Sequence, residues 1–327
     1  MYQNYYSKGQ GRTKTKSFGL LIFLLISTVA TPPVIAEVTH PTPVMPTQAN
    51  PHQLITEAQA LYQQGQFKAA IPLWQKAAHG FAQLEDSLNQ AMALSNLSLT
   101  YQQLEQWESA QNAIASSLEL LNSRTENDLI ILAQTLDIQG KLQQETGKLE
   151  EALITWQKSA EIYQKQHNIS ALDQNNLNQA QALRDLGLYP RACKHLLEAV
   201  SLTDISTCQQ LNHLTQAELK TKLKPIAANA SITTLSTLRN LGDILLIIGQ
   251  PKQSEQILRS NLDLAKKLNS LEELGVTYLS LGNTYQALAE AEEIQSQRLR
   301  YQQQALDAYN KAASLSPAKR IQVQAQL

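Results

Sequence analysis

The sequence is poor in several residue types that particular folds and functions need. Its 327 residues include two cysteines, 12 glycines and 11 prolines, and the formal net charge is −1. A chain without excess positive charge lacks the main source of nucleic-acid affinity, which is the neutralisation of phosphates. Scarce glycine and proline disfavour a β-rich fold and favour helices. No P-loop, GxGxxG or GxSxG motif occurs, so the common nucleotide-binding and serine-hydrolase signatures are missing.

The long apolar run that membrane spanning requires is also missing. The run from Phe18 to Ala30 has about 13 residues, whereas a bilayer takes ~20. Basic residues precede it, and small residues follow at Val34-Ile35-Ala36, an order typical of a secretory signal peptide. We expect export and cleavage after Ala36. Cleavage after Ala30, or an uncleaved anchor over 18–30, remains open, and no cysteine follows the run to make a lipoprotein.

Composition divides the chain into three parts. Residues 1–36 are the expected signal peptide, 37–50 a Pro-rich linker and 51–327 a long helical region. The linker contains the stretch THPTPVMPTQAN, which favours an extended backbone. In an exported protein Cys193 and Cys208 could form a disulfide, although two separate, partly buried thiols are the alternative.

A small–bulky–small pattern recurs along the helical region. Its positions i, i+4 and i+7 lie on one face of a helix, so the small residues admit a neighbouring helix and the bulky residue fills the gap. A second helix precedes each copy and mostly ends at a glycine, which suits a left-handed helix terminus. The copies are Ala70-Trp74-Ala77, Ala110-Ile114-Ser117, Ala152-Trp156-Ser159 and Ala192-Leu196-Ala199, with weaker ones at Ser254-Leu258-Asn261 and Ala305-Tyr309-Ala312.

This helix–turn–helix unit resembles the tetratricopeptide repeat. The resemblance rests on Tyr101, Gly140, Gly147, Ala152, Gly282, Tyr285, Ala305, Tyr309 and Pro317. It implies an all-α fold, a right-handed α-solenoid of about six helix pairs. The expected repeats are 51–84, 91–124, 133–168, 173–202, 235–268 and 275–317.

Two insertions and an open end interrupt this regularity. Residues 203–230 are expected to form an inserted turn and short helix, and the last repeat is long enough to prolong both of its helices. Residues 318–327 read as the start of another first helix. A solenoid usually ends in a polar capping helix, so this end suggests a fragment or a self-associating edge. The three tryptophans are interpreted as core or core edge, with a ligand pocket as the alternative.

Longer phrases resemble the amino-terminal half of exported cyanobacterial proteins that join such repeats to a CHAT domain, a caspase-like peptidase module. They include ALYQQGQFKAAIPLWQKAA, ALSNLSLTYQQLEQWESAQ and NQAQALRDLGLYPRA. The resemblance implies that a catalytic half could follow residue 327. No catalytic His or Cys of that module can be placed in this chain.

Catalytic and metal-binding chemistry has little support in the sequence. The one cluster is Cys193, His195, Cys208 and His213, which could be a zinc site or a Cys/His dyad. Cys193 and His195 are two residues apart and point to different sides of a helix. We therefore expect a non-enzyme without cofactor or metal, and no nucleic-acid or membrane contact beyond the leader.

The inner face of the first helices is the expected binding groove. Amide side chains both donate and accept hydrogen bonds and can hold the backbone of a peptide whatever its sequence. A solvated polar face is the alternative interpretation. The groove candidates, at equivalent repeat positions, are Asn96, Gln102, Asn178, Gln181, Arg184, Asn240, Asp243 and Asn283.

Three functions follow as expectations. The first is an exported scaffold that binds a peptide or a partner protein. The second is the sensor half of a CHAT-type peptidase, and the third is a structural protein that self-associates through its open C-terminal edge.

Overall fold

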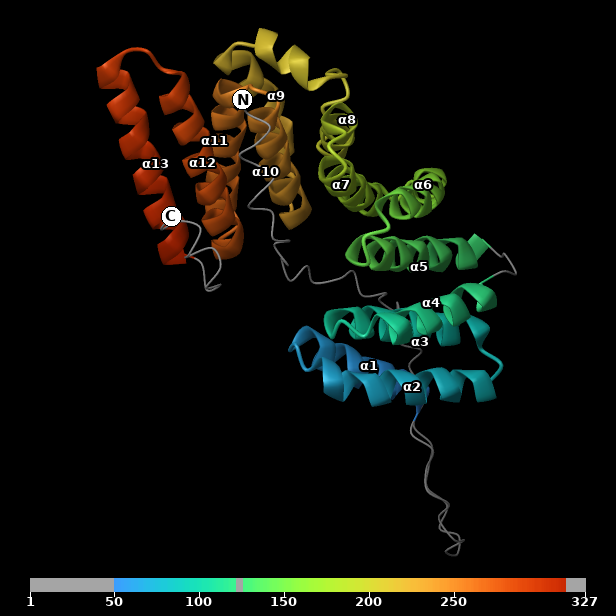
Figure 1. Cartoon of the computed structure of the whole chain (residues 1–327). Helices are drawn as coiled ribbons and strands as arrows, with labels where there is room; N and C mark the ends of the chain where they lie inside the picture. Colours follow the sequence, from blue (N-terminus) through green and yellow to red (C-terminus); the bar gives the residue numbers. More distant parts are fainter. Residues whose placement is uncertain (1–49, 122–125, 316–327) are drawn as a thin grey trace, which may run out of the picture. The chain divides into compact units, whose positions relative to one another are not determined.

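The computed structural model describes residues 50–121 and 126–315. Within these ranges the regular structure is helical, with thirteen α-helices and one 3-10 helix and no strand (Figure 1). The expected all-α solenoid of helix pairs is confirmed. The leader, most of the linker and the C-terminal segment 318–327 lie outside the described residues, so the predictions made for them stay predictions.

The helices follow one another as antiparallel pairs, and the chain divides into two compact units, 1–142 and 143–327. Each unit is described by itself. The pairs of unit 1 are α1 (Pro51–Gln63) with α2 (Phe67–Gln83) and α3 (Ser87–Gln103) with α4 (Trp107–Leu120). Those of unit 2 are α7 (Ile169–Asp185) with α8 (Tyr189–Ala199), α10 (Ile232–Ile247) with α11 (Pro251–Lys267), and α12 (Leu271–Ala291) with α13 (Gln295–Leu315). Between them in the sequence, α5 (Glu126–Glu145) crosses the boundary at residue 142 and α6 (Leu149–Lys165) opens unit 2.

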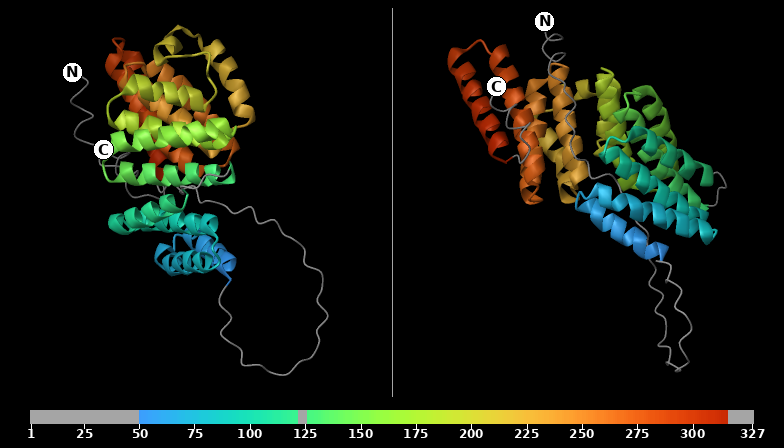
Figure 2. Two further views of the ribbon diagram at one scale, coloured as in Figure 1. Left: turned by 90° about the vertical axis from the view of Figure 1, so that its right-hand side faces the viewer. Right: turned by 60° about the horizontal axis from the view of Figure 1, so that its bottom comes forward.

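Unit 1 buries the small–bulky–small pattern of its second helices. Ala70, Trp74 and Ala77 on α2 are all at most 1% exposed, and Ala110 and Ile114 on α4 are fully buried. Their neighbours α1, α3 and α5 supply the remaining apolar side chains of one core, and Figure 2 shows the stacking of α1 to α4 from two further sides. Trp107 packs at the edge of this core.

Unit 2 repeats the arrangement with a core of its own. Trp156 on α6 is fully buried, as are Leu196 on α8 and Leu258 on α11. The interpretation of Trp74 and Trp156 as core residues is therefore confirmed. No helix among the described residues is both long and apolar enough to cross a membrane.

Left-handed residues end most of the helices. Gly65, Gly147, Gly187 and Gly249 have φ between +74° and +83° and follow first helices, as the sequence predicts. The turns after second helices reach the same conformation without glycine. The non-glycine residues with positive φ are Glu85, Glu105, His167, Ser201 and Asn269, and of these Glu105 follows a first helix.

Buried polar side chains join neighbouring helices, both within a repeat and between one repeat and the next. In unit 1, the Ser95 hydroxyl lies 2.8 Å from that of Ser117 and 2.9 Å from that of Thr135. In unit 2, Asn175 donates to Ser159 at 2.7 Å, and Asn261 donates to Thr277 at 3.0 Å. Ser117, Ser159 and Asn261 are third positions of the repeated pattern. Ser117 bonds the first helix of its own repeat, whereas Ser159 and Asn261 bond the first helix of the next one.

The insertion is built from a 3-10 helix, η2 (Cys208–His213), and α9 (Gln216–Ala228). The structure pairs Cys193 of α8 with Cys208 of η2 in a disulfide whose Cα atoms are 6.0 Å apart. Leu211, Leu219 and Leu223 of the insertion join the core of unit 2. The disulfide and these leucines fasten the insertion to the second-helix side of the unit.

The last pair is longer than the others, as the sequence predicts, with 21 residues in each helix. At its contact Gly282 of α12 faces the ring of Tyr309, which a Cβ atom at Gly282 would overlap. The Tyr309 hydroxyl lies 2.9 Å from Asn283 Oδ1 and 3.1 Å from Gln286 Oε1. The glycine thus allows the close approach of α13 that the ring contact requires.

Candidate functional site

Three of the eight predicted groove residues are buried in helix packing. Asn96 is 1% exposed, Gln102 5% and Asn240 2%. Gln102 Nε2 lies 3.3 Å from the carbonyl oxygen of Ile138 on α5, and Asn240 Nδ2 donates to the carbonyl oxygen of Ser236 at 2.8 Å. Their expected place on an open groove is therefore corrected. At these positions an amide side chain satisfies polar groups inside the fold and is not free to contact a partner.

The other five predicted residues reach solvent. Asn178, Gln181 and Arg184 on α7 and Asp243 on α10 are partly exposed, and Asn283 on α12 is exposed. Asn178 Oδ1 accepts from Gln174 at 3.1 Å. All of the accessible candidates therefore lie in unit 2, on the first helices α7, α10 and α12. The helix α10 contacts both of the others.

Polar contacts link these three helices into one surface, which we call the first-helix face. Arg184 of α7 donates to Asn240 Oδ1 of α10 at 2.9 Å, and Thr233 of α10 donates to Gln174 Oε1 of α7 at 2.9 Å. On its other side α10 meets α12. The face comprises Gln174, Asn178, Gln181, Arg184, Thr233, Ser236, Arg239, Asp243, Glu273, Ser280 and Asn283.

A charged cluster forms the junction of α10 and α12. Ser236 donates to Glu273 Oε1 at 2.6 Å, and Arg239 Nε donates to Glu273 Oε2 at 3.3 Å. Arg239 also lies 3.8 Å from Asp243. Burial raises the pKa of the Asp243 carboxyl above its ordinary value, and the Arg239 guanidinium and a Ser280 hydrogen bond oppose that shift.

The cluster is balanced in charge and differs in accessibility from one residue to the next. The Arg239 side chain is 15% exposed and that of Glu273 10%, so both mainly hold the helices together. Arg184 is 26% and Asp243 25% exposed, so each still offers polar atoms to a partner. A surface of this kind can bind peptide amides and single charges, and it has no excess of one sign.

Sequence reasoning missed Ser236, Arg239 and Glu273. Ser236 and Arg239 are the second and fifth residues of the repeat expected to begin at 235, and no candidate was taken from those two positions. Glu273 lies two residues before the expected start of its repeat, 275. Extending the expected repeat by one helical turn would have included it.

The cysteine and histidine cluster offers no chemistry of the predicted kinds. Cys193 and Cys208 are oxidised, so neither is a thiolate ligand or nucleophile. His195 lies 3.1 Å from Asn176 Oδ1 through Nδ1, and burial together with Lys194 and Arg191 lowers its pKa to about 4. Among the described residues no group of three or more His, Cys, Asp or Glu could hold a metal ion.

Comparisons with known proteins agree with this architecture. The model of the family described as tetratricopeptide repeat matches residues 54–123. Among curated proteins none matches this sequence. The solved structures described next are 14–16% identical to this chain and therefore bear on the fold alone.

Three solved structures illustrate that likeness. The apo form of RapI has a TM-score of 0.56 at 14% identity, over 81% of this chain and 99% of that one. A signal transduction ATPase (STAND) protein with a tetratricopeptide repeat sensor, from Pyrococcus horikoshii, has a TM-score of 0.57 at 16% identity, over 85% of this chain and 41% of that one. A Rap protein complexed with Competence and Sporulation Factor has a TM-score of 0.53 at 15% identity, over 84% and 76%. Residues 54–123 are thus tetratricopeptide repeats by sequence, and the described helix pairs as a whole have the fold of tetratricopeptide repeat proteins.

Proposed function

We propose that this protein is an exported, non-catalytic scaffold that binds a peptide or a partner protein on the first-helix face of unit 2. The observation that carries the proposal is the row of linked, partly exposed polar side chains on α7, α10 and α12, including Arg184 and Asp243. Adjacent first helices that share hydrogen bonds present a rigid polar surface, which lowers the entropy cost of binding. The Rap protein in complex with Competence and Sporulation Factor has the same fold, which supports a binding role.

The disulfide supports the exported location. Disulfides persist in oxidising compartments and are rare in the cytosol. The Cys193–Cys208 disulfide joins α8 to an insertion whose leucines belong to the core of unit 2. The folded structure therefore holds the two cysteines at a distance that suits a disulfide. The signal-like N-terminus, Lys8 to Ala36, points to the same location by an independent route.

Export is tested on the chain isolated from its own cells. Thiol alkylation followed by mass spectrometry should find Cys193 and Cys208 protected until a reductant is added, and the first residue should be Glu37. A cytosolic chain that retains Met1 and has both cysteines alkylated would overturn the exported location.

Site-specific photo-crosslinking tests the binding face. A photoreactive amino acid at Gln181 or Asn283 should crosslink one and the same partner, because both side chains reach solvent on the first-helix face. Lys158 is an exposed position of α6 outside this face and serves as the control. Equal crosslinking from the control, or none from the two face positions, would reject the face.

A charge substitution refines the result. Asp243→Asn should weaken the captured complex, and Lys158→Gln should leave it unchanged. Because Asp243 is only partly exposed, urea unfolding of each variant is needed to separate lost binding from lost stability.

A second candidate is the sensor part of a larger signalling protein, such as a CHAT-type peptidase. It is favoured by the likeness to the STAND protein, of which this chain covers 41% and whose description names a tetratricopeptide repeat sensor. Sequencing of the transcript downstream of codon 327 distinguishes the two. An in-frame peptidase segment would favour the sensor, and a stop codon would favour the separate scaffold.

A further inference from the structure

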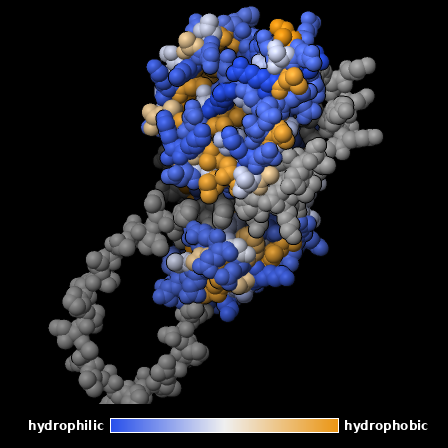
Figure 3. Space-filling view, turned by 90° about the vertical axis from the view of Figure 1, so that its left-hand side faces the viewer, coloured by the Kyte–Doolittle hydropathy of each residue, from blue (hydrophilic) through white to orange (hydrophobic). Residues whose placement is uncertain are grey.

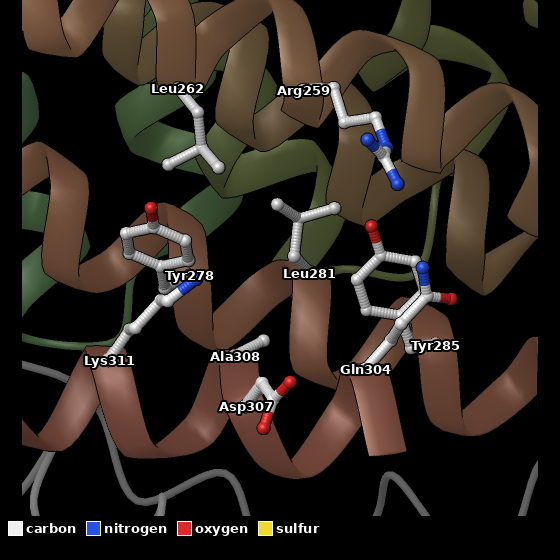
Figure 4. A pocket seen from close by; sticks show the side chains of 9 residues that line it. All are labelled: Arg259, Leu262, Tyr278, Leu281, Tyr285, Gln304, Asp307, Ala308 and Lys311. Atoms are coloured by element: carbon white, nitrogen blue, oxygen red, sulfur yellow. The ribbon is translucent and has the colours of Figure 1, made fainter. Parts of the chain in front are cut away.

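A groove on the second-helix side of the last repeat lies apart from the first-helix face. It has a cavity of about 250 Å³ and runs between α11 and α13, with α12 as its floor (Figure 4). All three helices belong to unit 2. Asn283 of the first-helix face is two residues away from Leu281 and Tyr285 of the groove, so it points to another side of α12. In the space-filling view from the α13 side, unit 2 is mostly hydrophilic, with apolar side chains in small groups (Figure 3).

The middle of the groove is apolar. Leu281 of α12 lies between Tyr278 and Tyr285 in Figure 4, and Leu262 of α11 and Ala308 of α13 form the two walls. The cavity is smaller than the ~300 Å³ at which pockets for small organic ligands begin. It therefore suits one large aliphatic side chain of a partner better than a whole small molecule.

The end of the groove at Tyr285 is neutral. The Arg259 guanidinium lies 5.9 Å from the ring centroid of Tyr285, and its Nε donates to Glu255 Oε1 at 2.8 Å. This ion pair leaves no unbalanced charge. The Arg259 side chain is 54% exposed, so its outer N–H groups can donate to a backbone carbonyl of a bound segment.

The opposite end, at Tyr278, is positive. Lys311 Nζ lies 5.4 Å from the ring centroid of Tyr278 and, within the part of the chain that the structure describes, forms no ion pair. Lys266 follows the wall residue of α11 by one turn, on the same face and towards the same end. Asp307 also lines the groove, and its carboxylate already accepts from Gln303 at 2.9 Å. Two lysines against one carboxylate leave this end with an excess of positive charge.

We propose that the groove between α11 and α13 binds a short segment of a partner protein in which a large aliphatic residue stands two positions from an acidic one. The aliphatic side chain packs over Leu281, and the carboxylate pairs with Lys311. The site does not depend on the function proposed for the first-helix face.

The length of the groove agrees with this spacing. Tyr278 and Tyr285 are seven residues apart on α12, which is two helical turns or ~10.5 Å along the axis. The distance from the middle of the groove to its positive end is therefore ~5 Å. In an extended segment, side chains two positions apart point the same way and are ~6.6 Å apart. The long, flexible Lys311 side chain can span the difference.

The tyrosine ring prepares Lys311 for this contact. A cation that is held over a ring face keeps its charge. It has also lost part of its conformational freedom, so its pairing with a carboxylate costs less entropy. The aliphatic side chain of the segment would exclude water from one side of the ion pair and so strengthen it.

Fluorescence anisotropy with a designed peptide tests the proposal on the purified chain. The probe is a labelled peptide with blocked ends, Ser-Glu-Ser-Leu-Ser-Glu-Ser, which presents a Glu on either side of Leu and can bind in either direction. We expect binding in the micromolar to submillimolar range that weakens at high salt. A peptide with Ser in place of Leu should bind about tenfold more weakly or worse, because it lacks the buried aliphatic contact.

Variants of the chain test the charge. Lys311→Glu should weaken binding of the acidic peptide by about tenfold, since repulsion replaces attraction. The same variant should bind the peptide Ser-Lys-Ser-Leu-Ser-Lys-Ser more tightly than the wild-type chain does. Tyr278→Ala should also weaken binding of the acidic peptide. Lys158→Glu makes the same change of net charge at an exposed position of α6 outside the groove and is the matched control.

Each outcome decides the proposal. A preference for the acidic over the basic peptide that Lys311→Glu reverses and Lys158→Glu retains supports it. No binding at ~1 mM peptide, equal binding of the Leu and Ser peptides, or equal losses in Lys311→Glu and Lys158→Glu overturns it. Circular dichroism of each variant ensures that lost binding is not lost folding.

Discussion

Reduction of the Cys193–Cys208 disulfide should destabilise unit 2 by about 3 kcal/mol. The two cysteines are 15 residues apart, and cross-linking a loop of this size removes unfolded-state entropy worth about 3 kcal/mol. Both residues are at most 2% exposed, so the reduced thiols gain little new solvation as long as the fold persists. Reduction therefore acts mainly by giving the unfolded chain more conformational freedom. The effect should appear as a lower free energy of unfolding.

Urea unfolding followed by circular dichroism, with and without dithiothreitol, measures the effect. For a slope of 1–3 kcal/mol/M the midpoint should fall by about 1 M or more. The control is Cys193→Ala/Cys208→Ala, whose midpoint should be the same with and without reductant. Trypsin gives a local readout, because reduction should speed cleavage after the lysines of α9. A wild-type midpoint that does not move on reduction would refute the reasoning.

Three further changes test other parts of the fold. The pKa of His195 is lowered to about 4, so on acidification the unfolded state binds the proton before the folded state does. The free energy of unfolding should therefore fall by up to ~3 kcal/mol between pH 6.5 and pH 4. His195→Gln should flatten that part of a profile of urea midpoint against pH, and an unchanged profile would contradict the assignment. Burial raises the pKa of half-buried Asp173 to about 6, so its charged form destabilises the fold above that pH. Asp173→Asn should therefore stabilise the fold at pH 8 by roughly 1 kcal/mol, allowing for the exposure of the side chain, and have little effect below pH 4. A loss of stability at pH 8 would argue against this cause of the shift. Gly282→Ala should cost about 1–3 kcal/mol because its Cβ overlaps the Tyr309 ring, and in a double-mutant cycle Tyr309→Ala should recover part of that loss, whereas strict additivity would show that the two residues do not interact.

The helix pairs could be predicted from the sequence because their signal is periodic and local. Small residues at i and i+7 around a bulky one require helix packing, and glycine marks a left-handed terminus. Glu85 and Asn269 adopt the same backbone conformation without glycine. An asparagine tolerates this conformation at a helix end. A glutamate does not indicate it, so at Glu85 the packing of the neighbouring helices imposes the turn.

The binding face was harder to predict than the fold. An asparagine in the middle of a helix can face solvent or bond a neighbouring helix, and both environments select the same side chain. Asn178 is partly exposed whereas Asn96 and Asn240 are buried, although all three occupy the same repeat position. The difference lies in the packing around each side chain, which depends on residues far away in the sequence.

The hydrogen bonds at the repeat junctions also bear on how such an array can change in evolution. Each junction uses different chemistry, with Thr135 bonded to Ser95 in one, Asn175 to Ser159 in another and Asn261 to Thr277 in a third. Duplication or deletion of one repeat would bring together helices whose buried polar groups do not match, and each unmatched group would cost roughly 1–3 kcal/mol. The repeats are therefore not interchangeable modules, and their number and order are held by the junctions between them.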